Sequence, residues 1–243
     1  MWSEMITLNI DGYELKAEKG QTILQVAREN GIDIPALCYH EALEPYGACR
    51  LCIVEISKGG RSRIVASCLY PAEDGLEVKT SSPKVIENRK TILELLLAKC
   101  SKNKVIRELA CQMGIEQSRF KPEYQEDEDC IVCGLCVRVC EQVVGVSAIS
   151  LVSRGTSKHP APPFHEPAAM CIGCGSCYYV CPTGAIKMEE RGDRRIIHNW
   201  KVEFKLKKCQ VCGNYWAPEQ QLDYIAKKWN LPQGFFDICP NCK

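Results

Sequence analysis

The sequence lacks several features that would place the protein in a membrane, outside the cell or on nucleic acid. No stretch of about 18 uninterrupted apolar residues is present, so we expect no membrane-spanning segment. The first residues, Met1–Glu4, lack the basic start and apolar run of a secretory signal, which predicts a cytoplasmic protein. The net charge of +1 gives no general attraction to nucleic acid or anionic lipid.

Motifs for catalysis are also missing. The sequence has no G-x-G-x-x-G after a predicted strand, no Walker loop and no Ser/His/Asp arrangement. No flavin or nicotinamide pocket and no motif for a hydrogen-activating metal cluster is recognisable. We therefore expect no enzymatic activity of the chain on its own.

Cysteine, in contrast, is abundant: 18 of 243 residues. In a chain without a secretory signal this number indicates bound metals, not disulfides. Two runs, Cys130–Cys140 and Cys171–Cys181, each have the spacing C-x2-C-x2-C-x3-C, and Pro182 follows the second. This spacing is typical of bacterial ferredoxins with two [4Fe–4S] clusters. Paired zinc sites or disulfides are the alternative, but zinc binding does not require this spacing of cysteines.

In such ferredoxins, the first three cysteines of a run bind one cluster and the fourth reaches the other cluster. The predicted ligands are Cys130, Cys133, Cys136 and Cys181 for one [4Fe–4S] cluster, and Cys171, Cys174, Cys177 and Cys140 for the other.

The amino-terminal region predicts a β-grasp fold. Met5–Ile10 and Tyr13–Ala17 alternate apolar and polar residues around an Asp-Gly hairpin signal. A capping box at Thr22 then opens a helix that ends at Gly31. Two further strands, predicted at Leu51–Ser57 and Arg61–Ala66, are joined by a Gly-Gly turn.

Four cysteines in this region, Cys38, Cys49, Cys52 and Cys68, follow the spacing C-x10-C-x2-C-x15-C. This region resembles the [2Fe–2S] domain of the large iron–sulfur subunit of complex I and of NAD-linked hydrogenases. Three short motifs carry the resemblance: Cys-Tyr-His at 38–40, Gly-Ala-Cys-Arg-Leu-Cys at 47–52 and Ala-Ser-Cys at 66–68. The resemblance implies that these four cysteines bind one [2Fe–2S] cluster. A zinc site is the alternative.

In that family, the next helix leads to a His-x3-Cys-x2-Cys-x5-Cys site for a further cluster. Here Ser82-Pro83 opens the helix, but Cys100 occupies the His position, and Lys104, Arg107 and Met113 occupy the cysteine positions. We expect this cluster to be absent, Asn103–Met113 to be helical, and Cys100 and Cys111 to be semi-buried thiols. The alternative is that these two thiols join ligands from a partner.

The stretches around the second run predict simpler structure. Glu123–Asp129 is an acidic linker, or alternatively a charge that lowers the potential of a nearby cluster. Arg154–Pro163 is rich in Gly and Pro and predicts a loop. Within Arg191–Lys208, alternating Val202, Phe204 and Leu206 predict an amphipathic strand with a charged outer face.

The carboxy-terminal region carries two C-x2-C pairs, which match a structural zinc site. The predicted ligands are Cys209, Cys212, Cys239 and Cys242. A mononuclear iron or a further [4Fe–4S] cluster is the alternative. Between the pairs, Leu222, Ile225, Ala226 and Trp229 predict an amphipathic helix.

Together these patterns predict an α+β protein of four modules. They are a β-grasp [2Fe–2S] ferredoxin domain (1–81), a helical connector (82–126), a bacterial dicluster [4Fe–4S] ferredoxin domain (127–190) and a small four-cysteine, zinc-like domain (191–243).

The order of modules over residues 1–190 resembles the small iron–sulfur subunit in the diaphorase part of bidirectional NAD-linked hydrogenases, and the front of electron-bifurcating iron-only hydrogenases. The resemblance implies an electron relay between a flavin subunit that oxidises NAD(P)H and a terminal catalytic subunit such as a hydrogenase, with ferredoxin as a further candidate partner. An iron–sulfur redox sensor is the alternative, although no output domain is recognisable. A nucleic-acid-binding zinc protein would require a basic surface, which the net charge does not support.

Overall fold

The structure, a computed structural model, describes residues 5–121 and 128–243. The chain folds into two compact units, Met1–Cys133 and Gly134–Lys243, each with its own main sheet. Met1–Glu4 and most of the acidic stretch Glu123–Asp129 lie outside the described residues. In the part that is described, no helix is long and apolar enough to cross a membrane.

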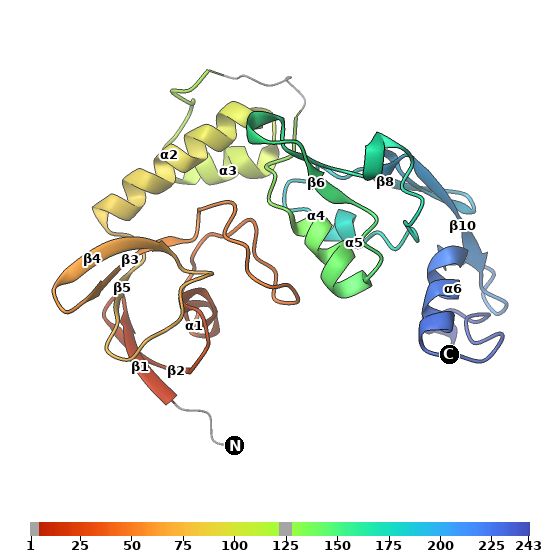
Figure 1. Cartoon of the computed structure of the whole chain (residues 1–243), viewed down its shortest axis with the longest axis horizontal. Coiled ribbons are helices and arrows are strands. Elements are labelled where there is room, and N and C mark those ends of the chain that lie inside the picture. The colour runs from red at the N-terminus through yellow and green to blue at the C-terminus, as the bar shows by residue number, and fades with distance from the viewer. Residues whose placement is uncertain (1–4, 122–127) are drawn as a thin grey trace. The chain divides into compact units, whose positions relative to one another are not determined.

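A five-stranded mixed sheet organises the first unit (Figure 1). Its strands are β1 (Met5–Ile10), β2 (Tyr13–Glu18), β3 (Ile53–Lys58), β4 (Arg61–Ala66) and β5 (Glu77–Lys79). In the order β2-β1-β5-β3-β4, β1 and β5 run parallel and the other neighbours run antiparallel. Both predicted hairpins are present, whereas β5 was not predicted because three residues are too few to show a periodicity.

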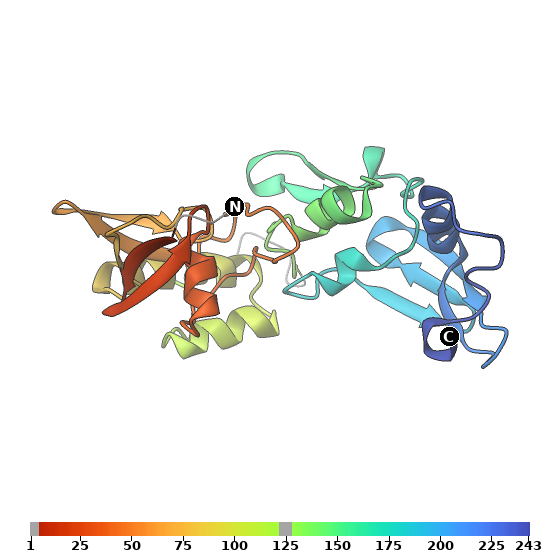
Figure 2. The same cartoon turned by 90° about the horizontal axis from the view of Figure 1, so that it is seen from below.

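Helix α1 (Ile23–Glu29) lies beside this sheet, as Figure 2 shows from a second direction, and its buried side chains join the core of the sheet. The helix begins at Thr22 as predicted. The Thr22 hydroxyl accepts the Gln25 amide at 3.3 Å, and the Gln25 side chain accepts the Thr22 amide at 2.8 Å, so two amides of the first turn are satisfied. The core that results includes two of the predicted cluster ligands, Cys52 and Cys68.

Helices α2 (Pro83–Lys99) and α3 (Lys104–Gln112) pack against each other after the sheet. The hydroxyl of Ser82 caps α2, and the side chain of Asn103 accepts the Ile106 amide at 3.3 Å to cap α3. Both helices agree with the predicted boundaries to within one or two residues.

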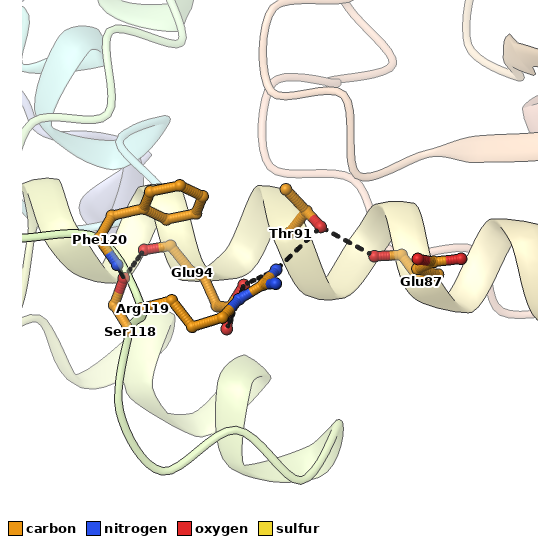
Figure 3. Close-up of polar contacts among 6 residues, drawn as sticks. All are labelled: Glu87, Thr91, Glu94, Ser118, Arg119 and Phe120. Carbon is orange, nitrogen blue, oxygen red and sulfur yellow. Dashed lines mark hydrogen bonds and ion pairs between the residues drawn. The ribbon is translucent and has the colours of Figure 1, made fainter.

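The chain that follows α3 is fastened to α2 by a bidentate ion pair (Figure 3). The Arg119 guanidinium donates to both carboxylate oxygens of Glu94 at 2.6 to 2.9 Å. The Ser118 hydroxyl donates to the Glu94 carbonyl at 2.7 Å and accepts the Phe120 amide at 3.0 Å. Because the Glu94 side chain is only 10% exposed, these contacts satisfy a carboxylate that the helix largely buries.

A buried guanidinium connects α2 to the sheet. The side chain of Arg89 donates to the carbonyl of Leu51 at 2.9 Å and to the carbonyl of Ile53 at 2.6 Å. These two carbonyls flank Cys52, and burial lowers the pKa of Arg89 from its usual range. Arg89 therefore holds the backbone on both sides of one predicted cluster ligand.

The second unit contains a four-stranded antiparallel sheet in the order β11-β10-β9-β8. Its strands are β8 (Met188–Arg191), β9 (Arg194–Ile197), β10 (Val202–Lys208) and β11 (Tyr215–Pro218). A smaller sheet pairs β6 (Ser150–Val152) with β7 (His159–Ala161). The helices are α4 (Leu135–Arg138), continued by a π-helical turn at Val139–Val144, α5 (Ser176–Tyr179) and α6 (Glu219–Lys228). Single 3-10 turns lie at Gly155–Ser157, Pro163–His165, His198–Trp200 and Pro240–Cys242.

Two predictions in this unit were wrong in detail. Arg154–Pro163 is not entirely loop, because β7 pairs with β6 despite its proline, which a strand at the edge of a sheet tolerates. Trp229 does not belong to the buried side of α6: the helix ends at Lys228, and the Trp229 side chain is 69% exposed. In both places, local composition and periodicity predicted a loop or a helix that extends further along the chain than it does in the structure.

We predict that Arg89→Met lowers the opening free energy of β3 by about 2 to 4 kcal/mol, because two buried carbonyls lose their charged donor. Hydrogen exchange of the β3 amides measures this quantity. Lys90→Met, at the neighbouring exposed position of the same helix, serves as the control. Equal protection of β3 in the two variants would show that Arg89 does not support the sheet.

Candidate metal centres

The first centre comprises Cys38 and Cys49 in the loop after α1, Cys52 just before β3, and Cys68 just after β4. All four thiols are buried. Cys38 lies against Cys49, whose amide donates to the Cys38 sulfur at 3.4 Å, and the side chains of Cys52 and Cys68 hydrogen-bond to each other. Four thiols in two pairs fit a two-iron cluster, in which each iron takes two cysteines.

Two contacts close the backbone around this first centre. Ser67 donates to the Cys52 carbonyl through both its amide, at 3.0 Å, and its hydroxyl, at 2.7 Å. Gly47 has φ +68°, and a Cβ there would collide with the side chain of Leu69. Glycine therefore suits the left-handed conformation of this turn, while the exposed Leu69 side chain could move away from an added methyl group. His40, in contrast, is exposed and accepts the Ala42 amide, as expected of a histidine outside the ligand set.

The second centre is a small cavity in the second unit, lined by four cysteines and by apolar side chains. Three of the cysteines, Cys171, Cys174 and Cys177, come from the second run, and Cys140 comes from the first run. The Ala148 amide donates to the Cys140 sulfur at 3.3 Å, and the indole of Trp200 donates to the Cys177 sulfur at 3.3 Å. The cavity thus brings the fourth cysteine of the first run beside the first three of the second run, and their binding of one cluster stays a prediction.

The electrostatics of this cavity fit a bound metal cluster. Burial is the main cause that raises the pKa of Cys171 to about 11 and that of Cys177 to about 12. Thiols with such pKa values stay protonated at neutral pH until a positive metal replaces the proton. Apolar walls, four thiols and N–H donors to sulfur together form a site that suits a [4Fe–4S] cluster.

The predicted ligands of the other [4Fe–4S] cluster are described within their own units. In the first unit, the Val132 amide donates to the Cys130 sulfur at 3.4 Å. In the second unit, Cys136 lies in α4 behind Gly134, which is left-handed at φ +74°, and the Cys181 sulfur lies 3.7 Å from the Thr183 hydroxyl. Cys136 and Cys181 contribute to the same apolar core. The ligand set with Cys133 and Cys130 stays a prediction.

Acidic residues next to Cys130 have partners in the first unit. Asp129 accepts a hydrogen bond from the Asn103 side chain at 2.8 Å, and Glu128 lies 3.7 Å from Lys99. These contacts connect the described end of the acidic stretch to the ends of α2 and α3. The positive charge of Lys99 offsets the negative charge of Glu128 near Cys130.

The sheet of the second unit packs on the loop that carries the second cysteine run. Gly173 has φ +72°, and a Cβ there would lie 2.6 Å from the ring of Phe204 in β10. Arg195 in β9 donates to the Gly173 carbonyl at 2.9 Å and pairs with Glu190 at 2.6 Å. Arg195 is 7% exposed and lies outside the amphipathic strand predicted around Phe204, in which Glu203 and Lys205 are exposed as expected.

The third centre lies near the carboxy terminus, where the structure brings together the two C-x2-C pairs. The sulfurs of Cys209, Cys212, Cys239 and Cys242 all lie within 4.8 Å of one another, and those of Cys212 and Cys239 are 3.9 Å apart. A tetrahedral ion with metal–sulfur bonds of about 2.3 Å places its sulfurs about 3.8 Å apart. This geometry fits a single metal ion.

Hydrogen bonds shape the third centre as well. The Cys239 amide donates to the Cys209 sulfur at 3.3 Å, and it is the main cause that lowers the pKa of Cys209 to about 6. Gly213 follows the first pair at φ +74° and donates its amide to the Cys209 carbonyl. Tight turns of this kind offer N–H donors to a sulfur that carries negative charge when a metal is bound.

The two remaining cysteines differ from each other. Cys100 is fully buried, and burial raises its pKa to about 12, while Cys111 is exposed. The prediction of two semi-buried thiols was therefore wrong for both. Residues 104–112 form α3, as the prediction of a plain helix at the lost cluster site requires.

The fold and these centres define a ferredoxin-type iron–sulfur protein with several clusters. The family described as "2Fe-2S iron-sulfur cluster binding domain" matches residues 3–83, and the family described as "4Fe-4S dicluster domain" matches residues 170–214. The second match contains Cys171–Cys181 and also Cys209 and Cys212.

Known proteins narrow this class. The chain is 34% identical to the G 2 subunit of NADH-quinone oxidoreductase from Rhizobium meliloti, over 75% of its length and 24% of the relative. It is 35% identical to the HndD subunit of the NADP-reducing hydrogenase from Solidesulfovibrio fructosivorans, over 76% of its length and 36% of the relative. A solved structure of an NAD+-reducing [NiFe]-hydrogenase in the H2-reduced state aligns with TM-score 0.59 and 31% identity, over 65% of this chain and 75% of that chain.

The chain belongs to the family of iron–sulfur electron-transfer subunits of NAD(P)-linked hydrogenase and dehydrogenase complexes, related to the amino-terminal part of the large iron–sulfur subunit of complex I. The resemblance found in the sequence, and the electron-transfer class that it implies, are thereby confirmed. The chain spans about a quarter to a third of the length of the curated relatives cited above.

Sequence reasoning missed the residues that support the centres from a distance. Arg89, Arg195 and Trp200 contact cluster loops that lie more than twenty residues away in the sequence. No local motif marks them. These side chains are recognisable only in the folded chain, where each is buried beside a loop that carries cysteines.

We predict that Gly173→Ala removes the cluster of the second centre, because the added methyl group collides with Phe204. Iron content of the protein purified without oxygen should fall by about four per chain. Gly192→Ala is the matched control, since Gly192 has a similar φ of +61° but open space around its Cβ position. Full iron content in Gly173→Ala would contradict the close packing of Phe204 on this loop.

Proposed function

We propose that the chain is an electron relay with one [2Fe–2S] cluster, two [4Fe–4S] clusters and one zinc ion. It would link a flavin subunit that oxidises NAD(P)H to a terminal enzyme such as a hydrogenase, in an electron-bifurcating complex in the cytoplasm. Ferredoxin is a further partner in this proposal. The observation that carries it is the apolar cavity that Cys140 shares with Cys171, Cys174 and Cys177.

The proposed ligand sets are those that the cysteine spacing and the family resemblance predict. Cys38, Cys49, Cys52 and Cys68 would hold the [2Fe–2S] cluster. Cys140, Cys171, Cys174 and Cys177 would hold one [4Fe–4S] cluster, and Cys130, Cys133, Cys136 and Cys181 the other. When bound, such clusters take up and release single electrons over a range of potentials that includes those of NAD(P)H and ferredoxin.

The residues of the chain supply burial and hydrogen bonds to these sites. Apolar walls around Cys177 exclude water, and amides such as those of Cys49 and Ala148 direct N–H groups at the ligand sulfurs. These groups stabilise thiolate charge without themselves gaining or losing protons. Supports of this kind serve electron transfer, which favours a role without turnover of its own.

The proposed modules remain 1–81, 82–126, 127–190 and 191–243. For the last module we favour zinc over a further [4Fe–4S] cluster, because a cube binds each cysteine through a separate iron and needs its sulfurs further apart than one ion does. The sulfurs within 4.8 Å of one another support the single ion, which would stabilise a module with a small core.

Metal analysis of the anaerobically isolated chain should give about ten iron and one zinc. About fourteen iron without zinc would make the carboxy-terminal site a fourth cluster and correct the zinc assignment. Little iron with several zinc ions, after reconstitution with iron and sulfide, would overturn the relay.

We further predict that Cys174→Ala uncouples the complex. NAD(P)H oxidation linked to the terminal reaction should be lost, while reduction of an artificial dye by the flavin subunit continues. Cys111→Ala, which removes an exposed thiol outside the proposed ligand sets, is the control and should leave coupling unchanged. Full coupling in Cys174→Ala with its other clusters loaded would contradict the proposed electron path.

A further inference from the structure

Trp200 is held in one position by the fold of the second unit. It ends the 3-10 turn His198–Trp200 between β9 and β10, and its side chain is 2% exposed. Its carbonyl accepts the Ala168 amide at 3.1 Å, and Trp200 belongs to the same apolar core as Ile197 and Ile186. The orientation of the indole is therefore determined by packing on several sides.

The indole lines the cavity of the second centre, and its Nε1–H donates to the Cys177 sulfur at 3.3 Å. A second donor to a sulfur of this centre is the Ala148 backbone amide, which contacts Cys140. The bond from Trp200 differs from it because the donor is a side chain, which a substitution can remove without changing the backbone.

A cluster gains negative charge when it is reduced, and part of that charge resides on the ligand sulfurs. The positive end of an N–H dipole stabilises the reduced form more than the oxidised form, so the bond raises the reduction potential. The low dielectric of the buried site strengthens this effect. The nearby Arg195 has Glu190 as its counter-ion, which offsets its charge.

We propose that Trp200 raises the reduction potential of the [4Fe–4S] cluster held by Cys140, Cys171, Cys174 and Cys177, through its hydrogen bond to Cys177. This inference rests on the ligand set of the proposed function. The hydrogen bond makes this cluster easier to reduce than it would be at the same site without the indole. A residue that binds no iron then helps to set the potential of one step in the electron path.

The test is a redox titration of the full cluster-loaded chain, followed by electron paramagnetic resonance. Trp200→Phe removes the donor. Replacement of Trp200 by 3-benzothienylalanine, whose sulfur takes the place of the indole N–H, removes the donor and keeps the ring volume. Trp216→Phe is the matched control, because the buried Nε1 of Trp216 has no hydrogen-bond partner among the described residues.

We expect the equilibrium constant for reduction of one [4Fe–4S] cluster to fall about threefold to tenfold in both Trp200 variants, tenfold being about 59 mV for a one-electron couple. The other clusters and the Trp216→Phe protein should titrate as the unsubstituted chain does. If Trp200→Phe loses the cluster, the potential measured in the benzothienyl variant tests the role of Trp200. An unshifted potential in that variant overturns the role of Trp200, whereas the absence of any [4Fe–4S] signal in the loaded unsubstituted chain overturns the proposed function instead.

Discussion

A thiolate is costly to bury unless a positive charge or several N–H donors lie beside it, and most features of the second unit depend on that constraint. Burial keeps Cys171 and Cys177 protonated in the absence of a metal. Loss of these protons and entry of a metal are therefore coupled. The same walls that make the metal-free site unfavourable for charge make the filled site dry, so that hydrogen bonds to sulfur have a large influence on the potential.

The supports of the three centres are supplied largely by elements outside the cysteine motifs. Arg89 reaches from α2 to the carbonyls around Cys52, and Phe204 of β10 occupies the space that Gly173 leaves open. In the last module, the Cys239 amide donates to the Cys209 sulfur and so links the two cysteine pairs. Small cores of this kind gain much of their stability from the metal, which explains why the donors and the apolar contacts converge on the sulfurs.

Local features could be predicted from the sequence because their causes are local. The capping box at Thr22, the hairpin strands and the spacing of the cysteines each need only a few neighbouring residues. Contacts between distant segments could not be predicted in this way. Trp200 meets Cys177 across 23 residues and Arg89 meets Leu51 across 38 residues, and both depend on packing that no local period records. The burial of Cys100 and the exposure of Cys111 were missed for the same reason.

The cavity shared by Cys140 and the second cysteine run has a consequence for the order of events during translation. Cys140 is synthesised 37 residues before Cys177, the last cysteine of that cavity. At about 5 to 20 residues per second, the thiol of Cys140 waits roughly 2 to 7 s before its partners have been added to the chain. During that interval the proposed ligand set is incomplete. With the proposed ligand set, the cluster of this cavity can be completed only after both cysteine runs have been translated.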